Sequence, residues 1–173
     1  MSLNGKKYVM LVEEDYNDLE VWYPVIRLRE EGAGVMLLGR EKGRTYTGKY
    51  GLSAVSDCTA ADISADEIDG ILIPGGWAPD MLRRDKGILD LVSRVNSQGK
   101  LVAAICHAGS VLVSAGILKG RKMTCFSSII DDVVNAGASY FDREVVTDGN
   151  LITSRTPDDL PAFMREIIKR ESR

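Results

Sequence analysis

Short apolar runs alternate along this chain with segments whose apolar residues recur at helical spacing. The runs are rich in Val, Ile and Leu and span residues 8–12, 35–38, 70–73 and 101–105. The helical stripes are Leu19-Trp22-Tyr23-Ile26, Ile88-Leu91-Val92-Val95 and Leu160-Phe163-Met164-Ile167-Ile168. Strands that alternate with helices in this way form a mainly parallel sheet that helices cover on both faces. The sequence therefore predicts an α/β fold, a three-layer α/β/α sandwich.

Residues 43–57 depart from this alternation, because glycines separate short stretches of alternating polarity. This pattern predicts a small β-hairpin excursion from the main sheet. No linker, repeat or low-complexity segment divides the chain. We expect one domain over residues 1–173, with residues 1–6 as a flexible or cloning-derived N-terminus. A chain of this length buries roughly 70% of its unfolded surface, so it needs no disulfide or metal to fold.

Charge and composition exclude several classes of function. The formal net charge is −3, and no long basic stretch marks a nucleic-acid surface. The longest apolar runs fall short of the ~18 residues of a membrane helix, and the N-terminus lacks the apolar core of a secretion signal. Cys58, Cys106 and Cys125 show no Cys-x-x-Cys spacing, which argues against disulfides or zinc. We expect a cytoplasmic protein with no metal, no cofactor, and no nucleic-acid or membrane partner.

Cys106 and His107 form the strongest chemical signal, because they follow the apolar run 101–105 and precede small residues that begin a helix. A nucleophile at such a strand-to-helix turn projects above the sheet. The positive end of the helix dipole there favours a thiolate. His107 is the only histidine of the chain, so any thiol–imidazole pair must use it. Cys58 and Cys125 lack such a setting and are expected to be structural.

Two other groups follow predicted strands, and ligands of such folds bind at the carboxyl ends of the strands. Gly75 and Gly76 come after the run 70–73, where their backbone N–H groups can stabilise an oxyanion. The N–H of His107 is a second candidate donor. An acidic cluster follows the first strand, and periodicity does not choose which of its carboxylates reaches Cys106. The cluster members are Glu13, Glu14, Asp15, Asp18 and Glu20.

Two other motifs, a magnesium site and a phosphate-binding loop, are excluded because this chain lacks residues that they require. A magnesium site of the phosphate-receiver type needs an aspartate after the third strand, where this chain has Pro74. The segment 43–50 nearly matches a phosphate-binding loop, but it lacks the Ser or Thr that would hold magnesium, and no helix is expected after it.

Several segments, in this order along the chain, resemble the PfpI intracellular protease family. The main matching segments are Ile73-Pro74-Gly75-Gly76, Ala104-Ile105-Cys106-His107, Ser114-Ala115-Gly116-Ile117-Leu118-Lys119-Gly120-Arg121 and Asp131-Asp132. Shorter matches include Asp18-Leu19-Glu20, Thr47-Gly48-Lys49 and Asp148-Gly149-Asn150. That family belongs to the DJ-1/PfpI superfamily, so the resemblance implies a flavodoxin-like, class I glutamine amidotransferase-like fold.

The resemblance also implies site roles. Glu20 matches the superfamily glutamate that hydrogen-bonds the reactive thiol. Asp80 stands where the family has a glutamate that orients the histidine from a neighbouring subunit. Trp77 stands beside the glycine pair at a substrate-binding position that is often arginine. A homo-oligomer, dimer or hexamer, with its active site near the interface is therefore expected. Glutaminase relatives of this fold use a histidine far downstream of the cysteine, and this chain has none. Glutamine amidotransfer is therefore not expected.

Three functional hypotheses follow. The first is a cysteine-dependent hydrolase of the PfpI type, either a peptidase or a deglycase or glyoxalase acting on glyoxal-type adducts. Its substrate would be a small-molecule or peptide carbonyl, which Cys106 attacks. The second is a redox-sensing stress protein or chaperone without turnover, because an exposed thiolate oxidises readily. The third is a binding module that kept the fold and lost the chemistry.

Overall fold

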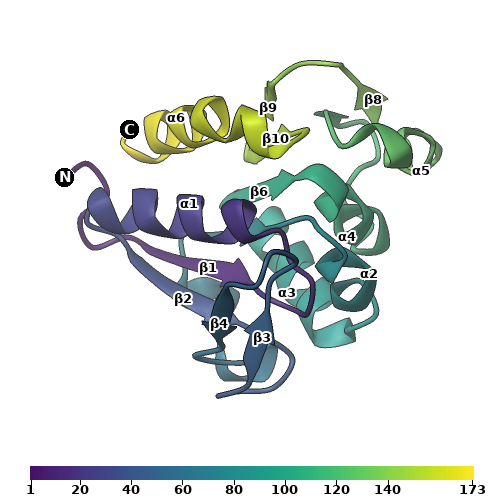
Figure 1. The fold of residues 1–173 in the computed structure, drawn as a ribbon. Coiled ribbons are helices and arrows are strands. Elements are labelled where there is room, and N and C mark those ends of the chain that lie inside the picture. The colour runs from purple at the N-terminus through teal and green to yellow at the C-terminus, as the bar shows by residue number, and fades with distance from the viewer.

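The computed structural model covers all 173 residues and confirms the α/β sandwich (Figure 1). Its main sheet has the strand order β2-β1-β5-β6-β10-β9, in which all neighbours are parallel except β9 and β10. The strands are β1 (Lys7–Leu11), β2 (Gly34–Leu38), β5 (Gly70–Ile73), β6 (Leu101–Ile105), β9 (Val145–Asp148) and β10 (Leu151–Ser154). The four apolar runs of the sequence therefore form four adjacent strands.

Helices cover both faces of the sheet. Helices α1 and α6 contact each other on one face, and α3 packs with α4 on the other (Figure 1). The helices are α1 (Asp18–Glu30), α2 (Ala78–Leu82), α3 (Lys86–Ser97), α4 (Gly109–Ser114), α5 (Ile130–Asn135) and α6 (Leu160–Glu171). Strand β1 lies between β2 and β5, so the strand order reverses direction at β1. Right-handed connections then place α1 and α3 on opposite faces.

Two small sheets lie outside the main one. The predicted hairpin is confirmed as β3 (Thr45–Thr47) paired antiparallel with β4 (Ser53–Val55). A second pair, β7 (Lys122–Met123) with β8 (Ser139–Tyr140), is parallel. None of the helices combines the length and the apolar composition that a membrane-spanning helix requires.

One continuous core joins the three layers, because 49 buried apolar residues form a single cluster. Leu3 belongs to it, although it lies in the segment 1–6 that we expected to be flexible. Leu3 is fully buried, and its N–H donates to the carbonyl of Glu31 at 3.0 Å. The core holds β1, β5 and β6 in register, so that the segments after these strands meet at one edge of the sheet.

Candidate active site

Cys106 stands at the turn that joins β6 to α4, as the sequence predicted. Its φ is +61°, a left-handed conformation that a residue with a Cβ rarely adopts. Such a conformation costs about 1–3 kcal/mol and persists only where the surrounding structure imposes it. Here the Phe126 N–H donates to the Cys106 carbonyl at 3.2 Å. The turn directs the thiol to the carboxyl edge of the sheet, where Cys106 is 7% exposed.

Two backbone N–H groups face the Cys106 sulfur, those of Gly76 and His107. Gly76 has a φ of +76°, and a Cβ at this position would lie 2.3 Å from the Asp15 carbonyl oxygen. Only glycine fits there, because the clash is with backbone that has no room to move. The sulfur therefore sits in a small cradle of N–H donors.

Gly75 has a different role from that of the oxyanion donor that we expected. Its N–H donates to Glu20 Oε2 at 2.6 Å, so it is already engaged and holds the carboxyl group in place. A Cβ on Gly75 would lie 2.7 Å from both Cys106 Cβ and Glu20 Oε2. The absent side chain is what lets the acid and the thiol approach each other.

Glu20 is the acid that reaches Cys106. It lies in the first turn of α1, where Asn17 Oδ1 accepts the N–H groups of Leu19 and Glu20 and starts the helix. The Glu20 side chain is completely buried and its carboxyl group faces the Cys106 thiol. Its Oε1 has no hydrogen-bond partner. Burial is the main cause that raises the pKa of Glu20 to about 7, so the carboxyl is partly protonated at neutral pH.

The surroundings of the thiol oppose its ionisation, in the opposite direction to the effect that we expected from the helix dipole. Burial, followed by the negative charge of Glu20, raises the pKa of Cys106 to about 12. The two N–H donors act in the opposite direction and lower it. Helix α4 is only six residues long. Its dipole therefore does not outweigh the loss of hydration.

His107 is held between two partners. Its Nδ1 lies 3.3 Å from Cys106 Sγ, and its Nε2 lies 3.0 Å from Ser128 Oγ. The ring stacks on Phe126 with centroids 4.7 Å apart. Burial, and then the positive charge of Lys49, lower the pKa of His107, which favours the neutral imidazole. With Nδ1 as acceptor for the thiol proton, Nε2 carries the hydrogen and donates to Ser128.

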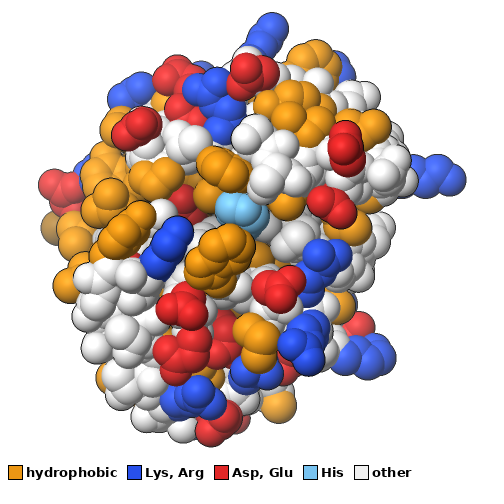
Figure 2. Space-filling model, turned by 45° about the vertical axis from the view of Figure 1, so that its right-hand side comes forward, with side chains coloured by type: hydrophobic (Ala, Val, Ile, Leu, Met, Phe, Trp, Pro, Cys, Tyr) orange, Lys and Arg blue, Asp and Glu red, His pale blue; other side chains and the backbone are white.

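The nucleophile opens onto a pocket of about 180 Å³ that includes Lys49, Trp77 and Phe126. Figure 2 shows the imidazole of the one histidine in the middle of this face, surrounded mainly by hydrophobic side chains. A second pocket of about 270 Å³ lies on the other side of Trp77 and His107. Asp80 lines this second pocket and makes no hydrogen bond to the imidazole of its own chain.

The rest of the acidic cluster stabilises local structure. Glu13 is buried and pairs with Arg40. Asp18 accepts the backbone N–H groups of Tyr50 and Leu52 at 2.8 and 2.7 Å. The structure thus brings together Cys106, His107, Glu20, Gly75, Gly76 and Trp77.

Two residues of the site were missed by sequence reasoning. Lys49 belonged to a matching segment, Thr47-Gly48-Lys49, which gave a signal but no role. Ser128 lies in a segment with no pattern that could have indicated it. No group of three or more His, Cys, Asp or Glu side chains is arranged to hold a metal ion.

Comparisons with known proteins identify the family to which the chain is similar. The model of the DJ-1/PfpI family matches residues 6–170. The chain is 44% identical over 163 residues to deglycase PfpI of Pyrococcus furiosus, covering 94% of this chain and 98% of that protein. It is 40% identical to general stress protein 18 of Bacillus subtilis, covering 94% and 95%. The crystal structure of Drosophila melanogaster DJ-1beta superposes with a TM-score of 0.90 at 29% identity, covering 96% and 90%.

Proposed function

This chain belongs to the DJ-1/PfpI family, and we propose that it is a cysteine-dependent hydrolase of the PfpI type that attacks carbonyl carbon with Cys106. The name of the Pyrococcus relative, deglycase PfpI, supports a deglycase, and we propose glyoxal-type adducts as its substrates. A peptidase uses the same first step, because both begin with addition of a thiolate to an electrophilic carbon. The substrate is therefore a small molecule or a protein that carries such a carbonyl.

One observation carries the proposal: acid, base and N–H donors all converge on a single sulfur. Glu20, His107 Nδ1 and the N–H groups of Gly76 and His107 surround Cys106 Sγ. A cysteine that only packs in the core does not require these groups around its sulfur. Cys58 and Cys125 differ from Cys106 in one respect: burial raises their pKa, as it does that of Cys106, but no backbone N–H donor acts in the opposite direction.

The chemistry follows from these contacts. Neutral His107 accepts the thiol proton at Nδ1 while sulfur forms a bond to the carbonyl carbon. The carbonyl oxygen gains negative charge, which the N–H groups of Gly76 and His107 stabilise. Protonation of Glu20 removes the repulsion that otherwise opposes a negative sulfur. The imidazolium then returns its proton to the leaving group, and water releases the product from sulfur.

The roles of Asp80 and of a second subunit are part of the proposal. Asp80 is exposed beside the imidazole, in the pocket on the far side from the thiol. A neighbouring chain of a dimer or hexamer can bring its own Asp80 to this pocket and orient His107. Within one chain Ser128 already makes a hydrogen bond at Nε2.

A panel of peptides, methylglyoxal and methylglyoxal-modified amino acids tests the function. We expect turnover of at least one class, and we expect Cys106→Ala to lower kcat/KM to the background rate. Cys58→Ala is the matched control, because it removes a buried thiol that has no N–H donors around it, and it should retain activity. Activity that survives in Cys106→Ala would refute the proposal.

A second candidate is a redox-sensing stress protein without turnover. The observation that favours it is the unpartnered Oε1 of Glu20 beside the sulfur, which can donate a proton to an oxygen added to Cys106. General stress protein 18 is one of the relatives. Rapid oxidation of Cys106 with no turnover of any substrate in the panel would favour this function over the hydrolase.

A further inference from the structure

Lys49 is a cation without an acidic partner at the pocket that contains Cys106. No carboxylate forms an ion pair with its ammonium group, whereas cations such as Lys6, Arg44 and Lys86 do have such partners. Its Nζ instead lies over two aromatic rings, 5.4 Å from the centroid of Trp77 and 5.9 Å from that of Tyr50. A positive charge is therefore held at the pocket and left available to a ligand.

The backbone of Lys49 is fixed by its neighbours. Its N–H donates to the Tyr16 carbonyl at 2.8 Å. The buried carboxylate of Asp18 accepts the N–H groups of Tyr50 and Leu52 and so anchors the rest of the turn. These two hydrogen bonds also occupy both oxygens of Asp18, which leaves that nearby acid engaged with the backbone.

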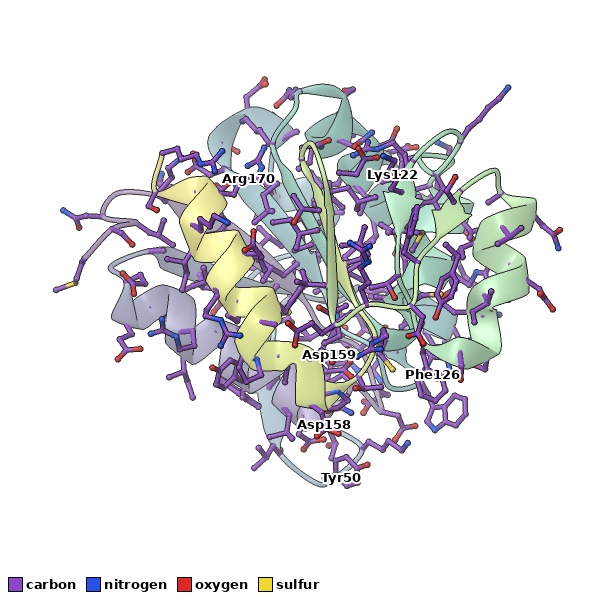
Figure 3. All side chains as sticks on the ribbon, turned by 90° about the horizontal axis from the view of Figure 1, so that it is seen from above. Tyr50, Lys122, Phe126, Asp158, Asp159 and Arg170 are labelled. Carbon is purple, nitrogen blue, oxygen red and sulfur yellow. The ribbon has the colours of Figure 1, made fainter.

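The pocket itself is small and is lined by aromatic and polar side chains. Its volume of about 180 Å³ is below the roughly 300–1,000 Å³ typical of sites for drug-sized ligands. Tyr50, Trp77 and Phe126 supply aromatic walls, and Figure 3 shows Tyr50 and Phe126 at the same end of the molecule. Lys49 and the N–H groups around sulfur contribute polar groups to the same lining. The charge of Lys49 reaches the reacting groups, because it lowers the pKa of both Glu20 and His107.

We propose that Lys49 selects substrates that carry a carboxylate next to the reacting carbonyl, namely small acids whose carbonyl carbon also bears the group that leaves during hydrolysis. The carboxylate pairs with the ammonium while the carbonyl carbon lies over Cys106 Sγ. This inference rests on the proposed nucleophilic role of Cys106 and adds the class of substrate. Aromatic walls and a single cation suit a short anion better than a long neutral chain.

Alkylation of Cys106 tests the charge preference without requiring turnover. Iodoacetate and iodoacetamide are nearly equal in size and differ in charge. With each, sulfur forms a bond to the CH₂ carbon and iodide leaves. The rate ratio of iodoacetate to iodoacetamide is measured at Cys106 by peptide mass spectrometry and is divided by the same ratio for glutathione.

We expect a normalised ratio above one in the wild type and a fall of about three- to tenfold in Lys49→Met, the range of a partly screened ion pair. Lys49→Arg should keep most of the preference. Lys119→Met, which removes an exposed lysine elsewhere, should leave the ratio unchanged. Raising the salt concentration should lower the wild-type ratio and leave that of Lys49→Met nearly constant, because salt screens the charge.

The outcomes separate this inference from the proposed function. Equal ratios in the wild type and in Lys49→Met overturn the role of Lys49, even if the substrate panel shows turnover that depends on Cys106. A preference for iodoacetate that depends on Lys49, together with no turnover, supports the anion site and counts against the hydrolase. Circular dichroism of each variant confirms that the fold is intact.

Discussion

Replacing Glu20 by Gln should make the protein more stable at alkaline pH and should not do so at acidic pH. The side chain of Glu20 is fully buried, and its pKa rises from the ordinary 4.5 to about 7. In the unfolded chain the carboxyl loses its proton near 4.5, whereas in the folded chain it keeps it until about 7. Between these values the folded state binds more protons, so the free energy of unfolding falls as the pH rises.

The size of the effect follows from that difference. One pKa unit is worth about 1.4 kcal/mol, so the rise to about 7 corresponds to about 3 kcal/mol of stability lost between pH 4.5 and pH 7. A Gln side chain is neutral throughout. Its carbonyl can still accept the Gly75 N–H, and its amide can face the side chain at position 106. It therefore keeps the hydrogen bond from Gly75 and avoids the buried charge.

Urea unfolding at a series of pH values from about 4 to about 8.5, which spans both pKa values, measures this. Both proteins carry Cys106→Ser, so that thiol ionisation does not contribute to either curve. We expect nearly equal stabilities below pH 4.5 and an advantage of about 3 kcal/mol for the Glu20→Gln variant above pH 7. Glu144→Gln, at an exposed acid without an ion pair, is the control and should show no such divergence. A stability difference between the Glu20→Gln variant and its parent that does not change with pH would refute the reasoning.

Further predictions concern the thiol and the imidazole. Mild peroxide should add oxygen to Cys106 before the other two cysteines, as followed by intact mass and peptide mapping; equal oxidation of all three would show that the N–H donors do not activate the sulfur. Ser128→Ala should lower kcat about two- to tenfold and shift the acidic limb of the pH profile, because His107 loses the hydrogen bond at Nε2. Asp80→Asn should lower kcat more than Ser128→Ala does only if a neighbouring subunit supplies Asp80 to orient His107. A protein that light scattering shows to be strictly monomeric would exclude that role.

The fold could be predicted from the sequence because strands that are buried on both faces of a sheet are continuous apolar runs. Fully apolar runs of four or five residues form most of β1, β5 and β6, and helical stripes lie between them. The turn after β6 was equally clear, since small residues follow Cys106 and His107. Local pattern and tertiary structure agree in these segments, so the position of the nucleophile could be predicted.

The contacts around the nucleophile were harder to predict because they join segments far apart in the chain. Periodicity left five acids open, and only the family resemblance selected Glu20. Nothing in the sequence separates the N–H of Gly75, which binds Glu20, from that of Gly76, which faces sulfur. Ser128 approaches His107 from 21 residues downstream. The state of the thiol also depends on desolvation, which is a property of the folded surroundings and not of the local dipole.

The position of Glu20 explains how a thiol with such a high pKa can still act as a nucleophile. The negative charge of Glu20 is one of the two main causes that hold the pKa of Cys106 high. That cause is absent in the molecules whose Glu20 is protonated, and a pKa of about 7 makes these a large fraction at neutral pH. In that form burial is the main remaining cause that opposes ionisation, and a thiolate left by transfer of the proton to His107 Nδ1 faces two N–H groups without a carboxylate charge beside it. The buried acid therefore favours a reactive sulfur by being neutral, which requires that its own pKa stay at or above neutrality.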